Sequence, residues 1–264
     1  MRLCRSMVVF LWVGAMTLRA DEPINVLLVG KEVDHPYGTH MYLFECELLA
    51  KCLRKMPGFE VTVSDGWPTD PKVLARTNVL VSYSADAGSR FLAGPPAKDF
   101  SALMDRGVGL VCLHWSTGCA NNEVGPRWRE TLGGWFSLEF SRLAVTPAKV
   151  LIAGANHPIA RGCDDFDLRD EYYLGLRFHE KAEPIAKVRL EGEEFPIAWS
   201  FARPQGGRSF GMVCGHFHDV FLNPTYRRLA IQAVLWTAGR DVPAEGVPIE
   251  IEQADGILPP EKQK

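Results

Sequence analysis

Five side chains in this sequence have the right chemistry to move protons or to hold a metal ion. They are His35, His40, His114, Glu171 and His216. Neutral imidazole and carboxylate groups shuttle protons near pH 7, and they also bind divalent metals. The spacing of His35 and His40 lacks the fixed helical offset of a specific metal motif, so the sequence does not separate the two roles. A divalent cofactor such as zinc therefore stays one of two interpretations.

Residues 107–118 indicate most clearly where a histidine of this kind would lie in the fold. Gly107 to Leu113 is apolar and bounded by glycine, which is typical of a strand buried on both faces of a parallel sheet. The chain then turns polar at His114. Ligands of open α/β sheets bind beyond the carboxyl ends of the strands, so this position predicts a site. A histidine that only caps the strand is the structural alternative.

Three further histidines follow apolar runs in the same way. His35 and His40 come after the run 24–30, and His216 comes after the run 209–214. The carboxyl ends of parallel strands share one rim of the sheet, and we therefore expect these side chains to meet there. A single histidine at the end of a strand usually has only a structural role. Several histidines after successive strands favour a functional site.

Aromatic and polar neighbours could hold a ligand beside this cluster. Glu171 lies in the polar segment 170–173, which we interpret as a loop. Aromatic faces suit a sugar ring, although packing in the core is the alternative for each of them. The expected substrate contacts are Trp115, Ser116, Tyr172, Trp199 and His218.

Alternating strands and helices would position these groups. Apolar runs and helical spacing in the first half predict strands at 24–30, 59–64, 78–83 and 108–113, with helices at 41–56 and 97–106. The second half predicts a short helix at 128–132, strands at 149–153, 185–190, 196–201 and 209–214, and a last helix at 225–238. The predicted fold class is α/β, a doubly wound, mostly parallel sheet with helices on both faces.

The two ends of the chain differ from the central domain, which we place at 21–241. Two arginines precede a mostly apolar run at 7–18, which is the layout of a secretory signal peptide over residues 1–20. That run is too short for a stable membrane anchor, so we expect export, periplasmic or secreted, after cleavage. Residues 242–264 are rich in proline and charge and predict a loosely packed extension.

Charge and cysteine content limit the partners of the exported chain. Three of the 29 basic residues and none of the acidic ones lie in residues 1–20, so cleavage changes the net charge from −3 to −6. Such a chain has no electrostatic reason to bind nucleic acid or an anionic membrane. The six cysteines that remain form no Cys-x-x-Cys pair, and their spacing predicts no disulfide.

Taken together and in order, these landmarks resemble the ThuA-like (trehalose utilisation) family. The matching pieces span nearly all of 24–240 and are Gly30-Lys31 with His35 and His40, 109–114, His157-Pro158-Ile159 with Gly162, 170–173, 196–199, Gly207-Arg208, Gly215-His216 and Trp236. The resemblance implies a flavodoxin-like fold of the class I glutamine amidotransferase type. It also implies that the recurrent polar residues of the family fall on His35, His40, His114, Glu171 and His216.

The amidotransferase relatives carry a nucleophilic cysteine on a sharp turn between strand and helix. By that resemblance His114 occupies or adjoins the turn here, while Cys112 stays inside the strand. A thiolate nucleophile needs a base and an accessible, electropositive setting, which a strand-buried cysteine lacks. Cys119 is the remaining candidate, and glutamine hydrolysis is therefore not the activity that we expect.

We expect an exported enzyme of carbohydrate metabolism that acts on a small-molecule or glycan substrate, a sugar or an oxidised sugar. His114 would serve as general base or metal ligand and Glu171 as its partner, with His35, His40 and His216 completing the pocket. Two alternatives stay open, a noncatalytic glycan-binding or scaffold protein and a metal-dependent hydrolase. The sequence does not indicate the oligomeric state.

Overall fold

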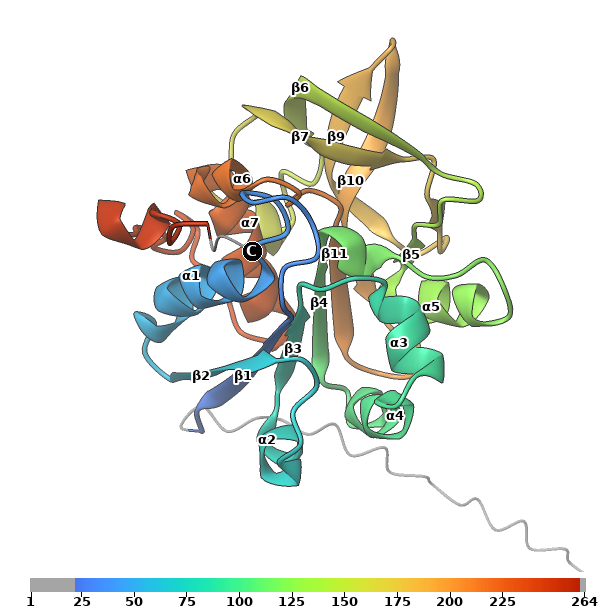
Figure 1. Ribbon diagram of the computed structural model, residues 1–264, viewed down its shortest axis with the longest axis vertical. Helices are drawn as coiled ribbons and strands as arrows, with labels where there is room; N and C mark the ends of the chain where they lie inside the picture. Colours follow the sequence, from blue (N-terminus) through green and yellow to red (C-terminus); the bar gives the residue numbers. More distant parts are fainter. Residues whose placement is uncertain (1–21, 262–264) are drawn as a thin grey trace, which may run out of the picture.

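A computed structural model gives the fold of this chain and describes residues 22–261 (Figure 1). The predicted signal peptide, residues 1–20, lies outside the described residues. The described part is an α/β structure built on one nine-stranded sheet, with a separate pair of short strands, β5 (Gly134–Trp135) and β8 (Arg177–Phe178). None of the helices in this part has the length and apolar character needed to span a membrane.

One half of the large sheet is parallel, in the order β2-β1-β3-β4-β11. Its strands are β1 (Ile24–Gly30), β2 (Phe59–Asp65), β3 (Val79–Ser82), β4 (Gly109–Leu113) and β11 (Arg208–Met212). β3 and β4 are buried along their whole length, because helices cover the sheet on both faces. The predicted α/β sheet and its apolar strands are confirmed.

Helices lie on both faces of this parallel half (Figure 1). On one face α1 (Tyr42–Arg54) contacts α7 (Pro224–Thr237), and on the other α3 (Ala87–Ala93) contacts α4 (Ala97–Asp105) and α5 (Val124–Leu132). The short helices α2 (Pro71–Arg76) and α3 are additions to the predicted set. A further short helix, α6 (His218–Leu222), follows β11.

The sheet continues beyond β11 as an antiparallel extension in the order β11-β10-β9-β6-β7. Its strands are β6 (Arg142–Ile152), β7 (Phe166–Leu174), β9 (Glu183–Leu190) and β10 (Glu193–Ala202). The interpretation of 170–173 as a loop is wrong, since these residues lie within β7. Both faces of this strand segment contact other parts of the protein, so charged and aromatic residues occur on each. The usual alternation of apolar and polar positions is therefore absent from the sequence.

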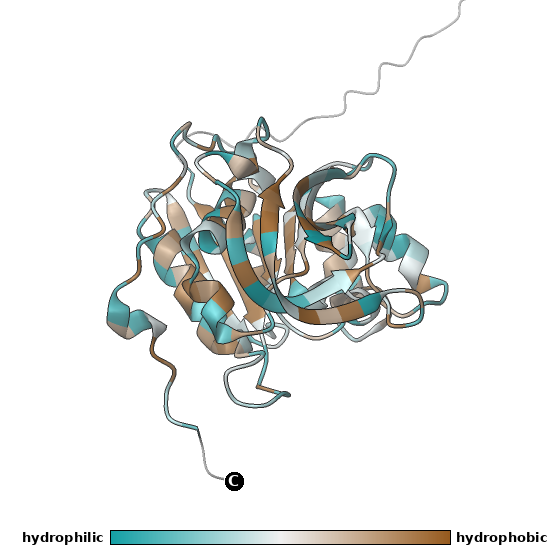
Figure 2. Cartoon of the chain, turned by 90° about the horizontal axis from the view of Figure 1, so that it is seen from above, coloured by the Kyte–Doolittle hydropathy of each residue, from teal (hydrophilic) through white to brown (hydrophobic). Residues whose placement is uncertain are grey.

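Two aromatic residues predicted to contact substrate belong to the core. Trp199 is fully buried, and its indole Nε1 donates a hydrogen bond to the Leu132 carbonyl over 2.9 Å. Tyr172 is also fully buried, and its hydroxyl donates to the Leu168 carbonyl over 2.8 Å. Neither ring offers a face to a ligand, so the substrate role is wrong and core packing is correct for both. Figure 2 shows many hydrophobic residues along the central strands of the sheet.

The C-terminal extension is packed more closely than predicted. Val242, Val247 and Ile249 are buried against the domain, with no more than 5% of their surface exposed. Arg227 on α7 donates a hydrogen bond from Nε to the Ile249 carbonyl over 3.1 Å. Apolar residues spaced among the prolines and charges of this segment supply the anchors that composition alone conceals.

The packing of Trp199 against β11 leads to a stability prediction. A Cβ at Gly211 would lie 2.2 Å from Cζ2 of Trp199. We expect Gly211→Ala to lower the free energy of unfolding by about 1–3 kcal/mol, because the buried ring has no room to move. Urea unfolding should show a smaller cost for the same substitution in a Trp199→Phe background, where the ring is smaller. Equal costs in the two backgrounds would contradict this packing argument.

Candidate functional site

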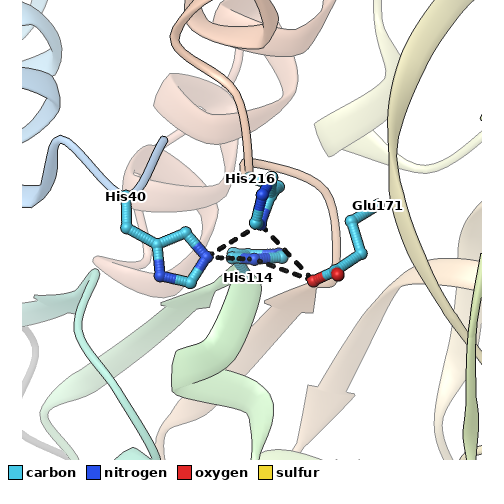
Figure 3. A group of neighbouring side chains, drawn as sticks. All are labelled: His40, His114, Glu171 and His216. Carbon is cyan, nitrogen blue, oxygen red and sulfur yellow. Dashed lines mark hydrogen bonds and ion pairs between the residues drawn. The ribbon is translucent and has the colours of Figure 1, made fainter. Parts of the chain in front are cut away.

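Four side chains from distant parts of the chain converge on one point (Figure 3). Nε2 of His40 lies 3.0 Å from Nε2 of His114 and 2.9 Å from Nδ1 of His216. Oε2 of Glu171 lies 3.7 Å from the same His114 nitrogen and 3.4 Å from the same His216 nitrogen. All four potential ligand atoms lie within 4.8 Å of one another. The predicted meeting of these residues at one rim is what the structure shows.

The sheet explains how these residues meet. His40 follows β1, His114 follows β4 and His216 follows β11, so all three stand beyond the carboxyl ends of parallel strands. Glu171 arrives from β7, in the antiparallel extension. The parallel half therefore supplies the imidazoles and the extension supplies the carboxylate.

The backbone at two of the histidines adopts an uncommon conformation. His40 has φ 47° and His114 has φ 51°, both in the left-handed region that most residues avoid. His114 directly follows β4 and begins the short 3₁₀ helix His114–Thr117, at the sharp turn expected from the family resemblance. Hydrogen bonds hold both turns, including one from the His40 amide to the His216 carbonyl over 3.0 Å. Such strain persists where the surrounding structure supports it, as it does at many functional sites.

His114 has a defined proton position. Its Nδ1 lies 2.7 Å from the Val213 carbonyl oxygen, which can only accept, so Nδ1 carries the proton. Burial lowers the pKa of His114 well below its ordinary value, and the ring is therefore neutral. Nε2 then presents a lone pair to the cluster. Tyr173 places its hydroxyl 3.0 Å from this nitrogen and can donate to it.

His40 is oriented by oxygen atoms behind its ring. Its Nδ1 lies 2.7 Å from the Tyr42 hydroxyl and 3.4 Å from Oδ1 of Asp34. A proton on Nδ1 satisfies both oxygens and leaves the Nε2 lone pair facing the cluster. Burial, with the nearby His35 and His216, lowers the pKa of His40 to about 4. Both buried histidines are thus neutral at pH 7.

His35 and Trp115 are partly exposed, lie beside His40 and do not join the four-atom cluster. The His35 ring lies on that of His40, with 3.7 Å between ring centroids, and 5.4 Å from the Trp115 ring. Nδ1 of His35 lies 2.7 Å from Oδ1 of Asp34. Despite partial burial, hydrogen bonds from Lys31 and His35 lower the pKa of Asp34 to about 2, so its carboxylate is ionised. His35 therefore donates from Nδ1 and directs Nε2 away from Asp34.

Two other predicted substrate contacts have structural roles instead. Ser116 is fully buried and bonds to Ser84, accepting from its amide over 2.7 Å and donating to its carbonyl over 2.9 Å. His218 has only 8% of its surface exposed. Its Nδ1 lies 2.6 Å from Oε1 of Glu45 and its Nε2 lies 2.8 Å from the Gly256 carbonyl. Both side chains are fully used by their neighbours, so neither is placed to bind substrate.

The sequence singled out the segment that holds Tyr173 and Asp170 without giving either a role, and it missed Asp34. Strand alternation could have found Tyr173, because it follows Glu171 by two residues and shares its face. Asp170 points to the opposite face of β7, where its carboxylate accepts hydrogen bonds from the amides of Gly215 (2.6 Å) and His216 (3.0 Å). It therefore holds the loop that carries His216. No local signal marks Asp34 except its place beside His35.

Neither candidate cysteine is placed to act as a nucleophile. Cys112 is fully buried inside β4, and burial raises the pKa of its thiol well above the ordinary range. Burial raises the pKa of Cys119 to about 11. Both thiols are protonated at neutral pH, whereas the nucleophile is the thiolate. The six cysteines of the described residues are all free.

The cluster fits a divalent metal ion. Ligand atoms bound to tetrahedral zinc lie about 2.0–2.2 Å from the ion and so roughly 3.3 Å from one another. Four of the six separations among the ligand atoms of His40, His114, His216 and Glu171 run from 2.9 to 3.7 Å, and all six are within 4.8 Å. Three imidazole nitrogens and one carboxylate oxygen are also a common donor set for zinc and similar ions.

Comparisons with known proteins agree with the fold. A family model, ThuA, described as trehalose utilisation, matches residues 25–237. A ThuA-like protein from Bacteroides uniformis has a similar structure, with TM-score 0.65, 19% identity and coverage of 89% of this chain and 99% of its own. One from Parabacteroides merdae has TM-score 0.64 and 14% identity, covering 90% of this chain and 100% of its own. These likenesses concern the fold alone.

A more distant structure is a glutamine amidotransferase from Thermotoga maritima. It has TM-score 0.42 and 10% identity, with coverage of 80% of this chain and 81% of its own. No curated protein matches the chain.

The lowered pKa of His40 predicts how the metal-free protein responds to acid. Between pH 6.5 and about 4 the unfolded chain protonates this residue while the folded chain does not. The unfolded state then binds more protons, so the free energy of unfolding must fall as pH falls, by about 3 kcal/mol across this window. Urea unfolding in the presence of a chelator measures the effect. His40→Asn is the control, because Asn tolerates the left-handed backbone and does not titrate. Parallel pH profiles for the two proteins would contradict the assignment.

Proposed function

Because the chain belongs to the ThuA (trehalose utilisation) family, we propose that it is a metal-dependent enzyme acting on a sugar or an oxidised sugar. The observation that carries the proposal is the convergence of three imidazole nitrogens and one carboxylate oxygen on a single point. His40, His114, His216 and Glu171 would hold the ion. This choice favours the metal-dependent alternative over a metal-free proton relay.

Counting donors and acceptors supports a cation at this point. Nε2 of His114 bears a lone pair because Nδ1 donates to Val213. Nε2 of His40 likewise bears a lone pair when Nδ1 faces Asp34 and Tyr42. These two lone pairs face each other at 3.0 Å with no proton between them, so a cation at this point would bind both. Low pKa values keep both nitrogens available as ligands even in mild acid.

With these four side chains as ligands, a bound divalent ion would need a fifth position, as catalytic zinc sites can provide, to polarise a substrate oxygen as a Lewis acid. The side chains around it would bind and orient the sugar. Trp115, half-buried beside His35, would present its apolar ring to the sugar ring. Tyr173 can donate a hydrogen bond from its hydroxyl, because burial raises its pKa well above the ordinary value and keeps it protonated.

His35 is the residue best placed to take a proton from the substrate. It is partly exposed, and Asp34 fixes its ring by accepting from Nδ1 over 2.7 Å. Nε2 is then free to accept, as a general base must be. We therefore assign His35 to proton transfer and the other three histidines to the metal.

Export and a role in carbohydrate metabolism stay part of the proposal. The layout of residues 1–20 supports export, and the family description supports a sugar-related substrate. The substrate would be small enough to reach Glu171 and His216, whose side chains are only about one-seventh exposed.

Metal analysis tests the first half of this proposal. We expect the purified mature chain to bind one zinc or similar ion per molecule. His216→Ala and Glu171→Gln should each weaken zinc affinity by more than roughly 100-fold, since they remove a direct ligand. His179→Gln is the matched control, because His179 pairs with Glu130 outside the cluster and should bind zinc normally. Wild-type protein that takes up no metal after incubation with zinc would refute the metal centre.

Turnover tests the second half. The zinc-loaded protein should convert at least one member of a panel of sugars and keto-sugars, followed by chromatography of the products. Tyr173→Phe should lower kcat/KM by about 10- to 100-fold, because it removes the hydroxyl beside His114 and leaves the ring packing intact. His35→Gln should lower kcat more than it raises KM. Sugar binding without any product would instead support a glycan-binding protein.

A further inference from the structure

The C-terminal extension lies outside the part of the chain that matches the family, residues 25–237, yet it is built into the structure. It leaves α7, buries Val247 and Ile249, and returns across α1 (Figure 1). Gln232 on α7 accepts a hydrogen bond from the Val247 amide over 3.0 Å. These anchors hold the first part of the extension to the domain.

The next part of the extension is held by exposed lysines on and just after α1. Nζ of Lys55 donates to the Glu250 carbonyl over 2.9 Å, and Nζ of Lys51 pairs with Oδ1 of Asp255 over 2.5 Å. Asp255 belongs to a short 3₁₀ helix, Gln253–Gly256, which Glu252 and Asp255 cap reciprocally. The extension therefore keeps a defined shape while it crosses the helix.

Its last described residues reach the loops of the candidate site. The Gly256 carbonyl accepts a hydrogen bond from His218 Nε2 over 2.8 Å, and the Pro259 carbonyl accepts from the Tyr37 hydroxyl over 2.8 Å. Tyr37 lies three residues before His40, and His218 lies two residues after His216. The extension thus contacts both loops that carry a proposed metal ligand.

The two loops are also joined to each other. Thr39 and Phe217 form an isolated antiparallel bridge, and the His218 amide donates to the Gly38 carbonyl over 2.9 Å. The other two ligands need no such support, because Glu171 lies within β7 and His114 directly follows β4. Half of the ligand set therefore rests on the sheet and half on this pair of loops.

We propose that residues 250–261 act as a strap that positions the loops of His40 and His216, with Tyr37 and His218 as the positioning residues that connect it to the site. The inference rests on the proposed metal centre for its functional consequence. Its structural part, the coupling of the extension to the two loops, stands independently. The Thr39–Phe217 bridge joins the two loops to each other, and the strap holds both from outside. Together these contacts keep the His40 and His216 nitrogens at the spacing that a metal requires.

The test loosens the strap by changing three exposed side chains and keeps the His218–Gly256 contact. A Tyr37→Phe, Lys51→Met, Lys55→Met variant removes the contacts to Pro259, Asp255 and Glu250 and leaves every proposed ligand in place. The matched control, Lys72→Met with Lys98→Met, removes the same charge from exposed positions in α2 and α4. Hydrogen exchange by mass spectrometry and zinc affinity by chelator competition are measured on the mature wild type, the variant and the control.

In the variant we expect amide exchange to become about tenfold faster in 250–261, 31–41 and 214–222, with 109–113 and 166–174 unchanged. Zinc affinity should fall about 5- to 10-fold, whereas the control should match the wild type. Faster exchange in 250–261 alone would overturn the proposal, and so would unchanged protection of that segment. A wild-type protein that binds no zinc would end the proposed function, while the exchange data would still decide whether the strap holds the loops.

Discussion

Burial of the His40 and His114 imidazoles in a neutral state is the constraint on which the rest of the site depends. A charged imidazolium would be costly in this low-dielectric setting, and two of them at 3.0 Å would repel each other. Instead, oxygen atoms beside Nδ1 of each ring accept its proton. They are the Val213 carbonyl for His114, and the Asp34 carboxylate and Tyr42 hydroxyl for His40. Each front nitrogen is left with a lone pair. The chemistry available to this protein follows from those two proton positions.

The architecture brings donors from two kinds of sheet to one place. Parallel strands end at a common rim, so the histidines that follow β1, β4 and β11 become neighbours without special packing. The antiparallel extension adds an acid, because β7 runs past this rim with Glu171 and Tyr173 on the face toward the histidines. The opposite face of the same strand carries Asp170, which fixes the loop of His216. One strand thus supplies one member of the cluster, Glu171, and the support of another, His216.

Support for the candidate site comes from polar contacts that do not reach the four-residue cluster. Ser116, Ser82 and Ser84 form a buried hydroxyl and amide network just beyond β4, where the chain turns after His114. His218 connects Glu45 of α1 to Gly256 of the C-terminal extension. Left-handed backbone at His40 and His114 is stable only because such contacts surround it. The polar residues near the site therefore form two groups. Some belong to the cluster, and others stabilise the backbone around it through hydrogen bonds.

The sequence by itself determined the parallel half of the fold and the place of the histidines. Short apolar runs such as 109–113 identify buried strands, and polar residues at their ends identify the rim, because both are local properties of the chain. Only the tertiary structure decided which aromatic rings are buried in the core and that 170–173 lies in a strand. It also decided that Ile249 anchors the C-terminal extension. Trp199 and Tyr172 look like Trp115 in the sequence, and only their packing partners separate them. Those partners lie far away along the chain, and a side chain acquires its neighbours, its exposure and its pKa only when the sheet has assembled.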